Sequence, residues 1–285
     1  MSGRPLRLLL EGGTFFEGPR WHDGRWWVSD FYRHAVFAVD KQGREQEVLT
    51  VAGQPSGLGW LPDDSLLVVS MKDRRLLRRS PAGEMSVHAE LGEFCGGHLN
   101  DLVVDSDGRA FVGNFGFDLT AREERKPTGL IRVDPNGSSS VAAENLLFPN
   151  GMVITDEGRT LIVGETYGRR YVAFGIEDDG SLTGRRIWAE LPDIAPDGCT
   201  LDADGYIWSA DAQGSRCCRL APGGQIVEEI RAPQHLQFFA CMLGGDDGRT
   251  LLLCAAPDFS EQRRSQAREA VLLTTTVDVP HSGLP

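Results

Sequence analysis

The chain has 285 residues, of which 41% are hydrophobic and 34 are glycine, and its formal net charge is −12. This length allows one large β domain or two ordinary domains. An acidic chain repels phosphate backbones and anionic lipid surfaces, so neither nucleic acid nor a membrane is an expected partner.

We expect no targeting signal at the beginning of the chain. Residues 1–7 lack the charged, apolar and cleavage regions of a signal peptide, and the apolar run Leu8–Leu10 is too short to span a bilayer. We therefore expect a cytoplasmic protein. The cysteines form no CxxC pair and no zinc spacing with histidine, so reduced, buried thiols are expected.

One pattern recurs six times along the chain: an apolar run, an acidic turn of the Asp-Gly type and a second apolar run. In chain order the copies begin at Gly18, Gly57, Asp101, Gly151, Gly198 and Ala240. Each copy is typical of a β-hairpin. The spacing of about 40–50 residues is the period of propeller blades.

Further strand candidates lie between the copies and begin at Ala35, Leu76, Leu130, Tyr171 and Cys218. Two strands from each copy and two from the segment after it would form a four-stranded blade. The sequence therefore predicts an all-β fold, a six-bladed β-propeller around a central channel, as a single domain over residues 1–285. The last strand candidate, residues 271–279, is expected to pair with Leu8–Leu10 and close the ring.

One position near the start of each copy carries a chemical pattern. Six or seven residues before the acidic turn, the copies hold Glu17, Ser56, Asn100, Asn150, Asp197 and Ala240. Equivalent positions in a propeller form a ring, so four oxygen-bearing side chains would converge at one mouth of the channel. Carboxylate and amide oxygens suit Ca²⁺, Mg²⁺ or Mn²⁺. The alternative is a turn, because an acidic residue or asparagine followed by glycine is a common turn dipeptide.

These segments resemble the gluconolactonase, regucalcin and luciferin-regenerating enzyme family. The matching runs, in family order over nearly the whole chain, are Glu17-Gly-Pro, Leu99-Asn-Asp-Leu-Val-Val-Asp, Pro149-Asn-Gly-Met and Pro196-Asp-Gly-Cys-Thr-Leu-Asp. The resemblance implies a six-bladed propeller with one divalent metal ion. Calcium is the expected ion, with Mg²⁺, Mn²⁺, Zn²⁺ or Fe²⁺ as alternatives.

The resemblance also implies roles for single residues. The positions that match direct metal ligands are Glu17, Asn150 and Asp197. Asn100 matches an asparagine that binds substrate, a metal-bound water or the metal itself. Asp101 matches an aspartate next to the metal or substrate, and Asp118 falls where sugar-binding members place an acidic substrate contact.

The chain departs from the family pattern at one position. Sugar-lactone members usually carry Arg-Phe-Asn-Asp where this chain has His98-Leu99-Asn100-Asp101. The guanidinium is lost, and arginine and histidine are not interchangeable at such sites. We expect His98 to contact substrate. Several phenylalanines nearby in sequence favour a less polar lactone or ester.

The predicted reaction is hydrolysis of a small lactone, with Lewis-acid activation of the carbonyl and attack by water. Asp197 is the preferred general base and Asp101 is its rival. Two alternatives stay open: hydrolysis of organophosphates or other esters at the same metal site, and a non-enzymatic metal-binding propeller. The expected partner is a small-molecule lactone or ester, and the protein is expected to be a monomer or small homo-oligomer.

Overall fold

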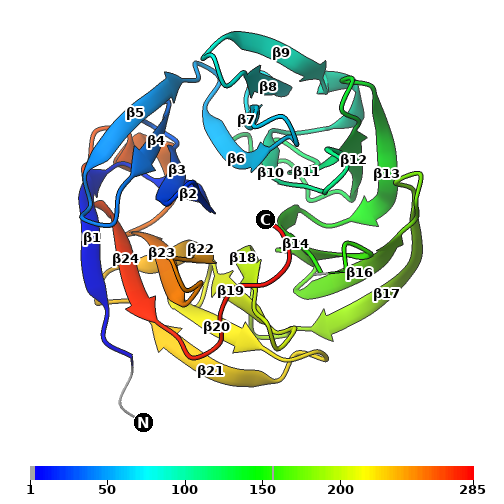
Figure 1. Ribbon diagram of the computed structural model, residues 1–285. Helices are drawn as coiled ribbons and strands as arrows, with labels where there is room; N and C mark the ends of the chain where they lie inside the picture. Colours follow the sequence, from blue (N-terminus) through cyan, green and yellow to red (C-terminus); the bar gives the residue numbers. More distant parts are fainter. Residues whose placement is uncertain (1–3, 156) are drawn as a thin grey trace.

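The computed structural model describes residues 4–155 and 157–285. Figure 1 shows six four-stranded antiparallel sheets arranged in a ring. This arrangement confirms the predicted six-bladed propeller. Helix is confined, in the described residues, to the short segments η1 (Gly92–Phe94) and α1 (Glu261–Arg264). Neither has the length and apolar character needed to cross a membrane.

Five blades are formed by strands that are consecutive in the sequence and run in order from the innermost strand outward. Blade 1 holds β2 (Phe16–His22), β3 (Arg25–Asp30), β4 (Ala35–Val39) and β5 (Glu45–Thr50). Blade 2 holds β6 (Pro55–Trp60), β7 (Leu66–Ser70), β8 (Arg75–Arg79) and β9 (Met85–Glu90). Blade 3 holds β10 (Leu99–Val104), β11 (Ala110–Asn114), β12 (Thr128–Val133) and β13 (Ser139–Leu146). Blade 4 holds β14 (Pro149–Ile154), β15 (Thr160–Glu165), β16 (Arg170–Ile176) and β17 (Leu182–Glu190). Blade 5 holds β18 (Pro196–Leu201), β19 (Ile207–Asp211), β20 (Arg216–Leu220) and β21 (Ile226–Arg231).

Blade 6 joins strands from both parts of the sequence. It contains β22 (Gln237–Gly244), β23 (Thr250–Ala256), β24 (Ala270–Thr276) and, as its outermost strand, β1 (Arg7–Gly13). The antiparallel register of β1 and β24 runs from Arg7 opposite Thr274 to Gly13 opposite Ala270. The predicted closure of the ring is therefore confirmed.

The burial pattern follows from the layered packing of the blades. The first two strands of a blade are largely buried, as in β10 and β11, while the outermost strands β5 and β9 are mostly exposed. Neighbouring blades pack face to face, and each inner strand contacts the inner strand of the next blade around the ring. The apolar core thus lies between blades, and the inner strands surround the axis.

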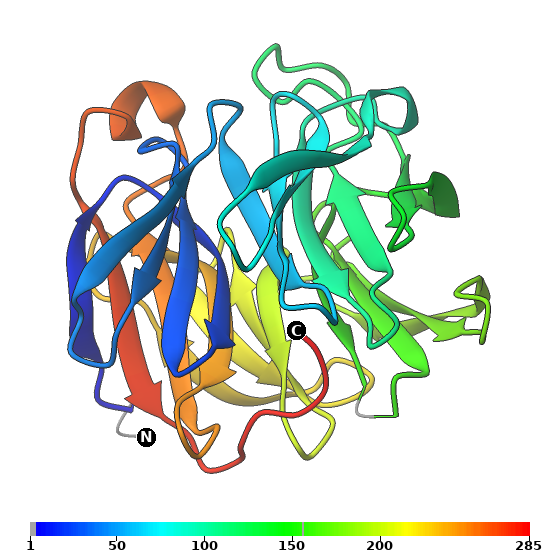
Figure 2. The same cartoon turned by 45° about the horizontal axis from the view of Figure 1, so that its top comes forward.

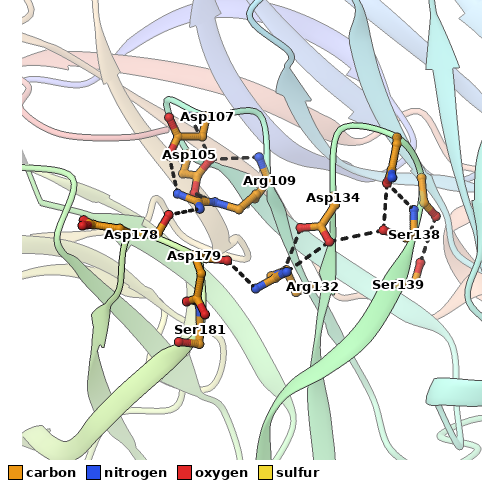
Figure 3. Close-up of polar contacts among 12 residues, drawn as sticks. Asp105, Asp107, Arg109, Arg132, Asp134, Ser138, Ser139, Asp178, Asp179 and Ser181 are labelled. Atoms are coloured by element: carbon orange, nitrogen blue, oxygen red, sulfur yellow. Dashed lines mark hydrogen bonds and ion pairs between the residues drawn. The ribbon is translucent and has the colours of Figure 1, made fainter.

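Hydrogen bonds from charged side chains link neighbouring blades at the hairpin turns. Figure 3 shows those between blades 3 and 4. Arg109 donates to Asp105 in its own turn at 2.7 Å and to the carbonyl of Asp178 in the next blade at 2.9 Å. Arg132 donates to the carbonyl of Asp179 at 2.9 Å. Backbone carbonyls of one blade therefore accept from arginines of its neighbour.

The two ends of the ring differ. The inner strands begin at one end, which we call the loop end. At the opposite end, residues 277–285 cross the hairpin turns of blades 5 and 4 (Figure 1). There Ala203 N donates to Pro280 O at 2.9 Å, Ser282 N donates to Leu201 O at 3.1 Å, and Ile154 N donates to Leu284 O at 2.8 Å.

Candidate functional site

A β-bulge occurs near the start of all six inner strands, at the position singled out in the sequence. One extra residue interrupts the pairing between each inner strand and its neighbour; the shifts fall at Glu17/Arg20, Pro55/Leu58, Leu99/Leu102, Pro149/Met152, Pro196/Cys199 and Phe238/Ala240. A bulge bends the strand and re-aims its side chains. The six inner strands therefore share one backbone irregularity at the loop end. In blade 6 the residue at the position of Asp197 is Phe239 and not the predicted Ala240, because Phe238 pairs with Ala255 as Pro196 pairs with Asp211.

The glycine after several of these positions allows close packing of the next blade. A Cβ atom on Gly151 would lie 2.3 Å from the carbonyl oxygen of Asp197, and one on Gly198 would lie 2.7 Å from Cα of Ala240. A Cβ on Gly18 would lie 2.6 Å from the carbonyl oxygen of Ser56. These glycines lie inside β14, β18 and β2, so the turn alternative is wrong for them.

Asn150 and Asp197, from adjacent blades, are in direct contact. The amide nitrogen of Asn150 donates to Oδ1 of Asp197 at 2.5 Å and to the hydroxyl of Thr166 at 3.1 Å. The hydroxyl of Thr166 in turn donates to the carbonyl of Pro196 at 2.7 Å. Asn150 and Asp197 are only 6% and 8% exposed. With its N–H groups directed at these partners, Asn150 has its carbonyl oxygen left for a ligand.

Glu17 and Asp197 lie close enough for the charge of Asp197 to raise the pKa of Glu17. Burial is the main cause that raises the pKa of Asp197 to about 8, and repulsion from Asp101 adds to it. Burial also raises the pKa of Glu17 well above its usual range, with repulsion from Asp197 as the next cause. Two desolvated carboxylates at one place disfavour ionisation of both. A cation between them would offset that cost.

Asn100 begins the inner strand between those of blades 2 and 4. It is buried, and its amide nitrogen lies 3.5 Å from the carbonyl of Pro149, the residue before Asn150. In residues 4–155 and 157–285, no group of three or more His, Cys, Asp or Glu side chains is placed to hold a metal. The predicted donor set contains only two such side chains, Glu17 and Asp197. Its other donors are the amide oxygens of Asn100 and Asn150. That chemistry fits a hard divalent cation.

Asp101 is held by an arginine that the sequence pattern did not single out. Arg20, on β2 of blade 1, donates to Oδ1 of Asp101 and to the carbonyl of Leu102 at 2.7 Å each. It also donates to Leu58 O and Pro19 O at 2.8 Å each, and it is 3% exposed. Arg20 thus crosses from blade 1 past blade 2 to blade 3. The one signal in the sequence was a basic residue three positions after Glu17 in the same inner strand.

His98 and Asp118 are, with Asn100, the predicted substrate contacts. The ring of His98 is 5.8 Å from that of Phe115, and burial, followed by the charge of Lys72, lowers the pKa of His98. Asp118 lies in the loop after β11, where its Oδ1 accepts from the hydroxyl and backbone N–H of Thr120 at 2.6 and 2.8 Å. These hydrogen bonds lower the pKa of Asp118. Substrate contact by either residue stays a prediction.

Carboxylates at the ends of the second strands fix the segments that lead into the inner strands. Each accepts from backbone N–H groups just before a donor residue: Asp30 from Thr14 and Phe15 at 3.0 and 3.1 Å, Glu165 from Leu147 at 2.7 Å, and Asp211 from Ala195 at 3.1 Å. Because these N–H groups lie within three residues of Glu17, Asn150 and Asp197, polar contacts hold the backbone just before each of these donors.

Comparison with known proteins adds a family match. The family described as the SMP-30/Gluconolactonase/LRE-like region matches residues 15–257. A 6-deoxy-6-sulfogluconolactonase of Pseudomonas putida is 26% identical over 214 residues, which cover 70% of this chain and 72% of that protein. A pentonolactonase of Haloferax volcanii is 26% identical over 246 residues, or 84% of this chain and 81% of that protein.

Solved structures share the fold at lower identity. A luciferin-regenerating enzyme superposes with a TM-score of 0.83 at 18% identity, covering 99% of this chain and 98% of that one. A calcium-binding regucalcin from Agrobacterium tumefaciens superposes with a TM-score of 0.81 at 21% identity, covering 100% and 96%. At these identities the likeness concerns the fold.

Proposed function

The chain belongs to the SMP-30/Gluconolactonase/LRE-like family, and on that premise we propose that it is a metal-dependent lactonase that opens a small cyclic ester with water. Two relatives that align over more than two thirds of their length are named as lactonases. The observation that carries the proposal is the meeting of Asn150 and Asp197 at 2.5 Å, with the half-buried Glu17 close enough for Asp197 to raise its pKa.

The residues that would hold the metal are Glu17, Asn150, Asp197 and Asn100. The raised pKa values of Glu17 and Asp197 support this role, because burial and carboxylate repulsion disfavour their charged forms and a bound cation would offset that cost. The oxygen-only donor set favours Ca²⁺, with Mg²⁺ or Mn²⁺ as close alternatives. When bound, the cation supplies Lewis-acid polarisation of the ester carbonyl.

Asp197 is the general base that we propose. Its Oδ1 accepts from Asn150, which fixes the carboxylate and leaves Oδ2 to take a proton from the attacking water. Asp101 is less suited, because its Oδ1 already accepts from Arg20 and from the backbone N–H of Leu102 at 2.7 and 2.8 Å. We propose that Asp101 instead anchors the start of β10, so that Asn100 keeps its place.

Thr166 orients the site without touching the substrate. Its hydroxyl accepts from Asn150 and donates to Pro196 O, so it fixes which way the Asn150 amide is turned. A single flip of that amide would turn a donor N–H toward the place where a cation needs an oxygen.

The test is a pH-drop assay of the purified protein over a panel of lactones, carboxylic esters and a phosphotriester. Each substrate is measured with chelator and with added Ca²⁺, Mg²⁺, Mn²⁺ or Zn²⁺. Cation-dependent opening of a lactone supports the proposal. Turnover of the phosphotriester alone would favour an organophosphate hydrolase, and tight calcium binding with no turnover would favour a binding protein.

A further inference from the structure

Aromatic side chains form a first wall at the loop end, on blades 6 and 1. The ring of Phe15 lies 4.8 Å from that of Phe239 and 5.1 Å from that of Phe31, and Phe239 lies 6.4 Å from Phe259. Phe15 and Phe239 are buried, whereas Phe259 is 56% exposed. The first wall (Phe15, Phe31, Phe239 and Phe259) therefore runs from the buried start of β2 out to solvent.

A second wall stands on blades 3 and 4. Phe115 and Phe148 are stacked with ring centroids 4.4 Å apart, and Tyr167 meets Phe148 edge-on at 5.0 Å. Phe117 lies 6.0 Å from both Phe148 and Tyr167. Phe115 and Tyr167 are half-buried, so this second wall (Phe115, Phe117, Phe148 and Tyr167) also reaches solvent.

The two walls lie on opposite sides of the donor residues. In a ring of six blades, the junction of blades 6 and 1 faces the junction of blades 3 and 4, and Figure 1 shows β2 and β14 across the axis from each other. Phe15 precedes Glu17 by two residues, and Phe148 precedes Asn150 by two. A molecule held at Glu17 and Asn150 would therefore have an aromatic wall on each side.

Like the equivalent Gln54 of blade 2, whose φ is +74°, Phe148 has a strained backbone. Its φ is +60°, a left-handed conformation that large side chains rarely adopt. The strain is imposed by two neighbours: Thr166 N donates to Phe148 O at 3.1 Å, and Leu147 N donates to Glu165 at 2.7 Å. At this position it directs the Phe148 ring onto Phe115.

The segment between β23 and β24, residues 257–269, carries the exposed Phe259 to the first wall. Tyr32 Oη, on blade 1, donates to the carbonyl of Phe259 at 2.6 Å, and Lys72, on blade 2, pairs with Glu261 of α1 at 2.8 Å. This segment thus reaches from blade 6 over blades 1 and 2. Figure 2 shows it (orange) at the same end as the loop after β11.

The chemistry of the two walls selects among lactones. An aldonolactone carries hydroxyl groups on its ring carbons, and each needs a hydrogen-bond partner when it leaves water. Aromatic faces offer apolar contact and stacking instead. Resting on the proposed lactonase function, we infer that the substrate is a lactone with an apolar aryl or alkyl substituent, held between the two walls while its ester group faces Glu17, Asn150 and Asp197.

The inference is tested by comparing three δ-lactones: dihydrocoumarin, which carries a fused aryl ring, δ-valerolactone, which carries no substituent, and glucono-δ-lactone, which carries hydroxyls. We expect the highest kcat/KM for dihydrocoumarin. Phe259→Ala in the first wall and Phe115→Ala in the second should each lower the ratio of kcat/KM for dihydrocoumarin over δ-valerolactone about 10-fold.

Leu8→Ala is the matched control, because Leu8 is also 56% exposed but lies on the outer strand β1. It should leave the ratio unchanged. A preference for glucono-δ-lactone, or an unchanged ratio in both wall variants, would overturn the inference and leave the lactonase in place. Hydrolysis of none of the three with any cation, while Ca²⁺ still binds, would overturn both.

Discussion

The side-chain amide of Asn150, on the inner strand of blade 4, donates to Oδ1 of Asp197, on the inner strand of blade 5, at 2.5 Å. The two residues are 47 positions apart in the sequence. Their contact is possible because Gly151 has no Cβ atom. The backbone at Asp197 can therefore pack directly against the backbone of blade 4. A contact between blades thus fixes two of the four proposed donors relative to each other.

We expect Asp197→Asn to lower kcat/KM for a lactone by roughly 100- to 10,000-fold, because it replaces a charged metal ligand with a neutral one and removes the proton acceptor. The pH-drop assay and a calcium titration measure the two effects separately. Ser56→Ala is the control, since Ser56 occupies the same bulged position in blade 2 without a carboxylate. Wild-type turnover in Asp197→Asn would remove Asp197 from the mechanism.

Calcium is expected to stabilise the protein more at higher pH. The folded pKa of Asp197 is about 8, above its ordinary value of 3.8, so the folded state binds more protons than the unfolded state between these values. The cation-free protein should therefore lose stability as the pH rises from about 4 to 8, by at most roughly 1.4 kcal/mol per pH unit for this group.

Calcium binds the deprotonated carboxylates and reverses that loss, so the calcium-induced rise in Tm should be larger near pH 8 than near pH 6. Differential scanning calorimetry with chelator and with calcium at both pH values measures it. Asp197→Asn serves as the control and should lose most of the pH dependence. An equal rise at both pH values in the wild type would contradict the assignment of the carboxylates.

Arg20→Met should destabilise the protein by about 3–5 kcal/mol, because it leaves the carboxylate of Asp101 buried without its partner. The double variant Arg20→Met/Asp101→Leu should regain part of this loss, since a well-packed apolar pair can replace a buried ion pair. Urea denaturation of both single variants and the double variant gives the coupling energy. If the loss of unfolding free energy in the double variant equals the sum of the two single losses, the 2.7 Å contact between Arg20 and Asp101 contributes little to stability.

Phe148→Gly should be more stable than Phe148→Ala by about 1 kcal/mol, although both remove the ring. The reason is the φ of +60° at this residue, which glycine adopts freely and alanine does not. Phe111, which is buried in β11 and has no positive φ, is the control position. There Phe111→Gly should be less stable than Phe111→Ala. The same order at both positions would contradict the strain at Phe148.

The repeated hairpins were predictable because their signals are local. Each blade has an acidic turn between two apolar runs, and the structure places these as the first two strands of every blade. The candidate donors were predictable for the same reason, since equivalent positions in a repeat must share one height along the axis. The pairing of β1 with β24 followed from the need to close the ring.

Other features depend on contacts that sequence spacing does not encode. Arg20 meets Asp101 across 81 positions, and its partner was visible only once blades 1 and 3 were placed on either side of blade 2. The β-bulges could not be predicted from the sequence either, because one extra residue in an inner strand does not interrupt its run of apolar residues. Phe259 was missed because it comes from the irregular segment 257–269, whose path depends on Tyr32 and Lys72.

The sharing of blade 6 between β1 and the last three strands has a consequence during synthesis. At about 5–20 residues per second, a ribosome needs roughly 10–50 seconds to make the chain between Gly13 and its partner Ala270. Throughout that interval β1 has an open hydrogen-bonding edge, which invites pairing with another nascent chain. Arg7 and Glu11 on β1 are charges of the kind that discourage such mispairing until β24 emerges.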